Sequence, residues 1–159
     1  MMRTIETTIY TFDELSDKAK ERAIEKQRYY VEYPWTKDCL DSLNAFCDEF
    51  GVKVTDYTLS DCYRASISTD ATARHFRGVK LSSFDREAMP TGFCLDCDLR
   101  YTFHDEFKRT GDAHHAFETA IEAFLSSVRR DIAYHYSDEA ITDFLQINDY
   151  EFTENGDIA

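Results

Sequence analysis

Residues 113–136, AHHAFETAIEAFLSSVRRDIAYHY, decide the fold class. Apolar side chains recur every three or four residues along this stretch: Phe117, Ile121, Phe124, Leu125, Val128 and Ile132. That spacing places them on one face of a helix, and the face has to be buried against other elements. The stretch therefore predicts a long amphipathic helix that packs into a hydrophobic core.

The flanking sequence predicts four more helices. Ser16 and Ser137 are suitable N-caps, because a serine oxygen accepts from the free N–H groups of a first helical turn. Pro34 breaks the first of these helices, and Gly51 and Gly111 follow two others where a left-handed residue commonly ends a helix. The expected helices cover about 13–33, 34–50 and 96–109, with a short one after Ser137 that carries Ile141, Phe144 and Leu145.

Short β-branched or alternating runs predict strands between and beyond the helices. They lie at 4–10, at 52–59 and 63–67 as a hairpin turned by Ser60-Asp61, near 79–81, and at 150–153 before an Asn155-Gly156 turn. The simplest architecture is α+β: one domain over residues 1–159, with about five helices packed on a small, mostly antiparallel sheet.

The composition points to a strongly acidic globular protein. The net charge is −13, from 31 acidic and 18 basic side chains. Free nucleic acid and anionic membrane surfaces are unfavourable ligands, because binding them requires Lys and Arg. A protein with a basic groove suits this charge, since opposite charges speed the encounter. No stretch is apolar enough for a membrane span, and MMRTIETTIYTF lacks the core of a secretory signal.

The excess charge is concentrated at the end of the chain. Residues 116–159 carry 10 acidic and 2 basic side chains. Aromatic side chains lie among these acids, a combination that suits protein recognition better than simple solvation. The alternative is a solvated surface with acids that stabilise a helix N-terminus. The expected partner-binding residues are Asp138, Glu139, Asp143, Asp149, Tyr150, Glu151, Glu154 and Asp157.

Five cysteines, an odd number, favour reduced thiols in a cytosol over a disulfide framework. Cys94 and Cys97 form a CxxC pair, which is typical of zinc and redox sites. A zinc site needs two further ligands, and the spacing of His104, His114 and His115 matches no standard finger. We therefore expect structural thiols and no metal or other cofactor, and keep a zinc- or thiol-dependent enzyme as an alternative.

Other chemical signals are weak. His104-Asp105-Glu106 places a base beside carboxylates, but nothing in the sequence brings it to a cysteine. Glycine-rich phosphate loops and the hydrolase and metalloprotease signatures are absent from the sequence. The one basic stretch, with Arg64, Arg74, Arg77, Lys80 and Arg86, is interpreted as balancing acids elsewhere in the fold. We expect no catalytic residues.

Both ends of the chain resemble a group of small acidic proteins from bacteriophages and prophages. The segments are YTFDELSDKAKERA at 10–23, and YSDEAI at 136–141 with NDYEFTENG at 148–156. Members are often labelled as antitoxins of a toxin–antitoxin stability system. The resemblance implies a phage or prophage origin and a place in the host cytoplasm, and it transfers no functional residue.

Three functional hypotheses follow. The first is a binding protein that inhibits or modulates a host nucleic-acid-handling defence protein, of the anti-CRISPR or anti-restriction type, with DNA mimicry as one way to do so. The partner would be a nuclease, a CRISPR effector or a restriction subunit. The second is an antitoxin-like neutraliser of a toxin, and the third is the enzyme that uses Cys94 and Cys97. A homodimer is also open, because exposed aromatic side chains favour self-association.

Overall fold

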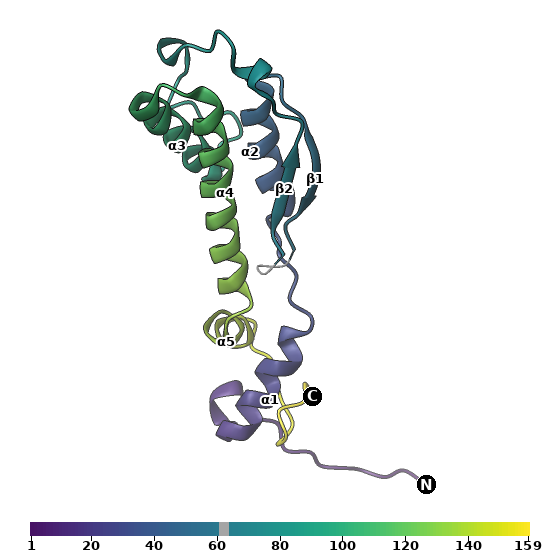
Figure 1. Cartoon of the computed structure of the whole chain (residues 1–159). Helices are drawn as coiled ribbons and strands as arrows, with labels where there is room; N and C mark the ends of the chain where they lie inside the picture. The colour runs from purple at the N-terminus through teal and green to yellow at the C-terminus, as the bar shows by residue number, and fades with distance from the viewer. Residues whose placement is uncertain (61–63) are drawn as a thin grey trace. The chain divides into compact units, whose positions relative to one another are not determined.

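Five α-helices and one two-stranded antiparallel sheet are present in the computed structural model, which describes residues 1–60 and 64–159 (Figure 1). The α-helices are α1 (Asp17–Arg28), α2 (Thr36–Asp48), α3 (Leu95–Thr110), α4 (Ala113–His135) and α5 (Asp138–Ile147). The strands are β1 (Val54–Thr58) and β2 (Ser66–Thr69), and the 3-10 helices are η1 (Phe12–Glu14), η2 (Ala73–Phe76) and η3 (Leu81–Ser83). The α+β fold class is confirmed. None of the described helices is both long and apolar enough to cross a membrane.

The predicted helix boundaries follow the expected capping chemistry. The Ser16 hydroxyl accepts from the Ala19 N–H at 3.2 Å, and the Ser137 hydroxyl accepts from the Ala140 N–H at the same distance. Gly111 ends α3 with φ 72°, the left-handed value expected of a glycine at this position. The first helix is shorter than predicted, because residues 12–14 form a separate 3-10 turn and α1 ends at Arg28.

Three of the predicted strands do not form. Residues 1–9 have no regular structure, and only Tyr10 pairs, with Phe152. Phe152 also bridges Ile158, so the last predicted strand is reduced to two isolated bridges. The run at 79–81 leads into the 3-10 helix η3 instead. A β-branched run becomes a strand only where a neighbour supplies a ladder and a face to pack on, which these segments lack in the described part of the chain.

The predicted hairpin is present but shorter. Strand β1 pairs with β2 in antiparallel register, with Thr58 opposite Ser66 and Tyr57 opposite Ile67. The Arg129 guanidinium on α4 donates to the Ala65 carbonyl at 2.8 Å, which fixes the end of β2 to this helix. The predicted turn at Asp61 and the strand residue Tyr63 lie outside the described residues, as does Cys62.

The chain contains two compact units, and the expectation of one domain over 1–159 stays a prediction. Unit 1 comprises Met1–Glu32 with Ala133–Ala159, and unit 2 comprises Tyr33–Ile132. Unit 2 is built around aromatic rings. The Phe46 ring stacks on Phe117 of α4 at 5.5 Å and meets the Phe103 ring of α3 edge-on at 5.9 Å. These contacts join α2, α3 and α4 around one core, as the apolar stripe on α4 predicts.

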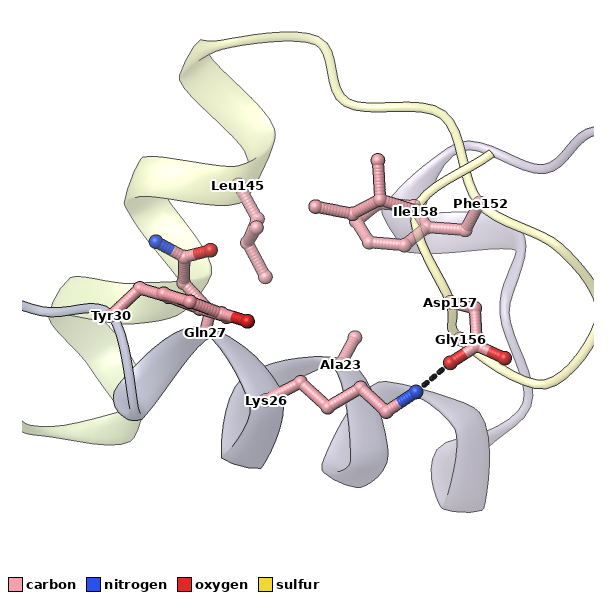
Figure 2. A pocket seen from close by; sticks show the side chains of 9 residues that line it. All are labelled: Ala23, Lys26, Gln27, Tyr30, Leu145, Phe152, Gly156, Asp157 and Ile158. Atoms are coloured by element: carbon pink, nitrogen blue, oxygen red, sulfur yellow. Dashed lines mark hydrogen bonds and ion pairs between the residues drawn. The ribbon is translucent and has the colours of Figure 1, made fainter.

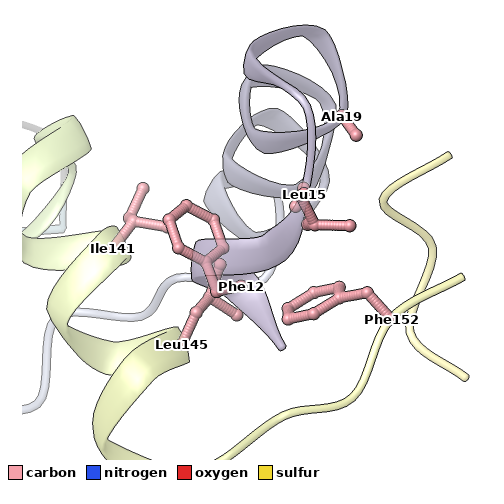
Figure 3. Packing of buried hydrophobic residues seen from close by; sticks show 7 residues of the cluster. Phe12, Leu15, Ala19, Ile141, Leu145 and Phe152 are labelled. Carbon is pink, nitrogen blue, oxygen red and sulfur yellow. The ribbon is translucent and has the colours of Figure 1, made fainter. Parts of the chain in front are cut away.

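Unit 1 has a smaller core that joins the two ends of the sequence (Figure 3). Its buried side chains come from η1, α1, α5 and the terminal segment: Phe12, Leu15, Ala19, Ala23, Ile141, Leu145 and Phe152. The Phe12 and Phe152 rings meet edge-on, with centroids 6.1 Å apart. The small side chains on α1 leave room for the terminal segment to approach its backbone. The acidic end of the chain is therefore a folded part of unit 1.

Candidate partner-binding surface

All eight predicted partner-binding residues belong to unit 1. They lie on α5 and on the segment 148–159 that follows it. Because Ile141 and Leu145 are buried, the remaining faces of α5 point away from the core. Glu139 and Asp143 are one helical turn apart and exposed. At Asp149 the backbone adopts φ 51°, a left-handed conformation that aspartate tolerates better than most residues, and the chain turns back toward the core.

Two of the predicted acids are neutralised within unit 1. Asp138 forms an ion pair with Arg28 at the end of α1. Asp157 forms an ion pair with Lys26 and lies 3.8 Å from the Arg22 guanidinium. These pairs connect α1 with the C-terminal part of the chain. Asp138 and Asp157 therefore contribute to holding unit 1 together more than to an outward-facing charge.

Five predicted acids remain uncompensated. Their side chains are exposed and form no ion pair with the described residues: Glu139, Asp143, Asp149, Glu151 and Glu154. Unit 1 as a whole has 14 acidic and 6 basic side chains, for a net charge of −8. Residues 131–159 contain no Lys or Arg at all. The negative charge on this part of unit 1 is therefore open to a cationic partner.

Large apolar side chains lie among these acids. Phe144 is 42% exposed and Ile147 is 78% exposed. Ile141 and Leu145 are the buried residues of α5, and Phe144 lies outside this core. The Tyr150 ring lies 5.8 Å from the Phe144 ring and is half-buried. The four-residue spacing from Asp143 to Ile147 was a sequence signal that could have placed Ile147 on the outer side.

We call the seven outward-facing residues Glu139, Asp143, Phe144, Ile147, Asp149, Glu151 and Glu154 the terminal acidic surface.

Unit 1 also contains a cavity of about 280 Å³ between α1, α5 and the terminal segment (Figure 2). Leu145, Phe152 and Ile158 supply most of its apolar wall, and Ala23 lies on the α1 side. The Lys26–Asp157 ion pair lies at its edge.

Among the described residues, the predicted bases do not contact the CxxC cysteines. Within the described residues, no hydrogen bond joins a histidine to Cys94 or Cys97, and the His104 ring contacts Asp105 at 3.1 Å instead. Burial is the main factor that raises the pKa of Cys94, with Asp98 adding to the effect. Burial also raises the pKa of Cys39 to about 11 and of Cys47 to about 12. These thiols are protonated at neutral pH and are therefore weak nucleophiles.

The described residues also do not assemble a zinc site of conventional composition. Residues 1–60 and 64–159 bring together no group of three or more His, Cys, Asp or Glu side chains that could hold a metal ion. His114 stacks on the Phe76 ring at 4.9 Å, and His115 contacts Glu106. The interpretation of the basic stretch as charge balance fits Arg86, which pairs with Asp105 at 3.0 Å.

No protein-family model, curated protein or solved structure matches the chain. The resemblance of its two ends to acidic phage proteins therefore stays a prediction.

Proposed function

We propose that the protein acts by binding rather than by catalysis, and that its terminal acidic surface binds a partner protein with a basic groove. The partner class that this charge suits best is a nucleic-acid-handling defence protein of a bacterial host. The observation that carries the proposal is that five carboxylates of α5 and the segment after it are exposed and form no ion pair with the described residues, and that Phe144 and Ile147 of α5 are exposed as well.

Carboxylates on this surface can interact with a basic groove in the same way as the phosphates of a nucleic acid. Both supply negative charge and hydrogen-bond acceptors to Lys and Arg, and both attract them over long distances. Because residues 131–159 contain no Lys or Arg, no permanent positive charge in this stretch repels a cationic partner. Such an inhibitor competes with nucleic acid for the groove.

The apolar side chains give the surface a means of recognising one protein. Charge alone attracts many cationic proteins, whereas a buried aromatic or aliphatic anchor adds affinity only where a matching pocket exists. Phe144 and Ile147 are separated by less than one helical turn on α5 and are the natural anchors. Nucleic acid has no equivalent of them, so the partner would contact both its own groove and a neighbouring apolar patch.

The test is an affinity capture from bacterial lysate with three forms of the tagged protein. The first is wild type, and the second reverses four charges: Asp143→Lys, Asp149→Lys, Glu151→Lys and Glu154→Lys. The third is a control that changes two exposed acids of unit 2, Asp48→Lys and Glu122→Lys. We expect wild type and control to retain the same nucleic-acid-handling protein, released by high salt and by added duplex DNA.

The reversed variant should retain nothing at any salt concentration while keeping the far-UV circular dichroism of wild type. Equal retention by the reversed variant and wild type contradicts the proposal. Retention of a toxin in place of a nucleic-acid-handling protein contradicts the choice of partner class and supports the antitoxin hypothesis.

A further inference from the structure

Two cysteines lie one helical turn apart at the start of α3, and the sulfur atom of a methionine contacts the second of them. Cys94 is the residue before the helix and already has right-handed helical dihedrals, φ −59° and ψ −26°. Cys97 follows one turn later, and its N–H donates to the Cys94 carbonyl at 3.2 Å. Residues three apart on a helix share one side. The preceding loop adds Met89, whose Sδ atom lies 3.4 Å from the Cys97 Sγ atom.

These sulfur atoms are accessible from solvent. Cys94 is exposed, Cys97 is partly exposed, and Met89 is 45% exposed. Cys39 and Cys47 differ, since both are buried in unit 2. Core packing does not explain the contact between the Cys97 and Met89 sulfur atoms, because both residues are at least partly exposed to solvent, as is Cys94.

The candidate ligands are all sulfur atoms, which are soft donors. They do not include the further Cys, His or carboxylate ligands of a conventional zinc site. Thiolate and thioether sulfur favour Cu(I), whereas zinc in proteins usually takes four ligands from Cys, His and carboxylates. In the described part of the chain no His or carboxylate joins the two cysteines in a metal-binding group. We propose that Cys94, Cys97 and Met89 form a surface site for one Cu(I) ion, with two thiolates and one thioether as ligands.

Binding at this site exchanges two protons for one monovalent cation. The two thiols each lose a proton to solvent, the thioether contributes a lone pair, and copper stays in its reduced state. Because the exchange releases protons, it becomes more favourable as the pH rises. The reduced interior of a cell supplies copper as Cu(I), the state that the site requires.

The experiment uses the full, reduced chain under oxygen-free conditions. Cu(I) is titrated in the presence of a coloured Cu(I) chelator, and copper taken by the protein is read as lost chelator colour. We expect one equivalent to bind to wild type, and Cys94→Ser and Cys97→Ser each to abolish the uptake. Met89→Leu keeps the side-chain size and should weaken binding by at least about tenfold, the loss that even outer-shell changes cause at metal sites.

Three control variants separate this site from thiols in general. Cys39→Ser, Cys47→Ser and Cys62→Ser should each keep the full equivalent, provided that their far-UV circular dichroism is unchanged. Excess Zn(II) should not displace the copper. Unchanged uptake by the double variant Cys94→Ser/Cys97→Ser overturns the site, and equal affinity of Met89→Leu and wild type removes Met89 from it.

Discussion

Replacing Gly156 by alanine should detach the terminal segment from α1. Gly156 has φ 85°, a left-handed value, and its N–H donates to the Thr153 carbonyl at 3.0 Å. An added Cβ would overlap the carbonyl oxygen of Ala19 and lie 3.1 Å from its carbonyl carbon. Because the obstacle is helix backbone, no side-chain rotation relieves the overlap. The terminal segment has to move away from α1.

Two costs combine at this position. A non-glycine residue in a left-handed conformation costs about 1–2 kcal/mol. Forcing an extra carbon into a packed contact costs about 1–3 kcal/mol more. Gly156→Ala should therefore lower the free energy of unfolding by about 2–5 kcal/mol. Gly78→Ala is the matched control, because Gly78 has φ 77° and nothing lies within 4 Å of an added Cβ.

Urea unfolding followed by far-UV circular dichroism measures both variants, and hydrogen exchange locates the change. We expect Gly78→Ala to lose only the conformational part, about 1–2 kcal/mol. In Gly156→Ala, amides in α1 and in residues 150–159 should exchange faster than in wild type, while those of α3 are unchanged. Equal losses in the two variants would refute the close approach of the terminal segment to Ala19.

Three further predictions concern unit 2. Arg100 is 2% exposed, pairs with Glu49 and donates to the Asp85 carbonyl at 2.8 Å. Arg100→Met should therefore lower the free energy of urea unfolding by about 1–3 kcal/mol. An unchanged free energy would show that these bonds do not stabilise the fold. Hydrogen bonds from Arg86 lower the pKa of Asp105 to about 2, below its ordinary 3.8. The stabilisation is thus present above pH 4 and lost as the pH falls toward 2, and Arg86→Gln should remove this pH dependence from unfolding curves. At pH 8 a disulfide reagent should modify exposed Cys94 quickly and buried Cys39 only on unfolding, and equal rates would contradict their burial.

The helices could be predicted from sequence because local signals determine them. The apolar stripe of α4, the Ser16 and Ser137 caps and Gly111 act over a few residues each, and all of them appear in the structure. The strands at 4–10 and 150–153 could not be predicted reliably. A strand depends on a partner distant in sequence, and here the described residues form only the isolated bridges of Phe152 with Tyr10 and with Ile158.

The negative charge of the candidate site could be predicted from the sequence, but the ion pairs of its side chains could not. Counting charges located the acids of the C-terminal region, but the ion pair between Lys26 and Asp157 joins residues 131 positions apart. The contact between Met89 and Cys97 depends on a loop that carries no repeating pattern. The exposure of Phe144 could not be predicted, because three apolar residues in five positions do not show which of them face the core.

Photo-crosslinking in bacteria tests the terminal acidic surface most directly. A photoreactive amino acid replaces Ile147 on this surface or Glu122 on α4, and irradiated cells are examined for a discrete covalent adduct. We predict an adduct with a nucleic-acid-handling protein from position 147, none from position 122, and its loss when the four acids 143, 149, 151 and 154 are reversed. An adduct from position 122 alone, or one from position 147 that persists after charge reversal, would contradict binding through the terminal acidic surface.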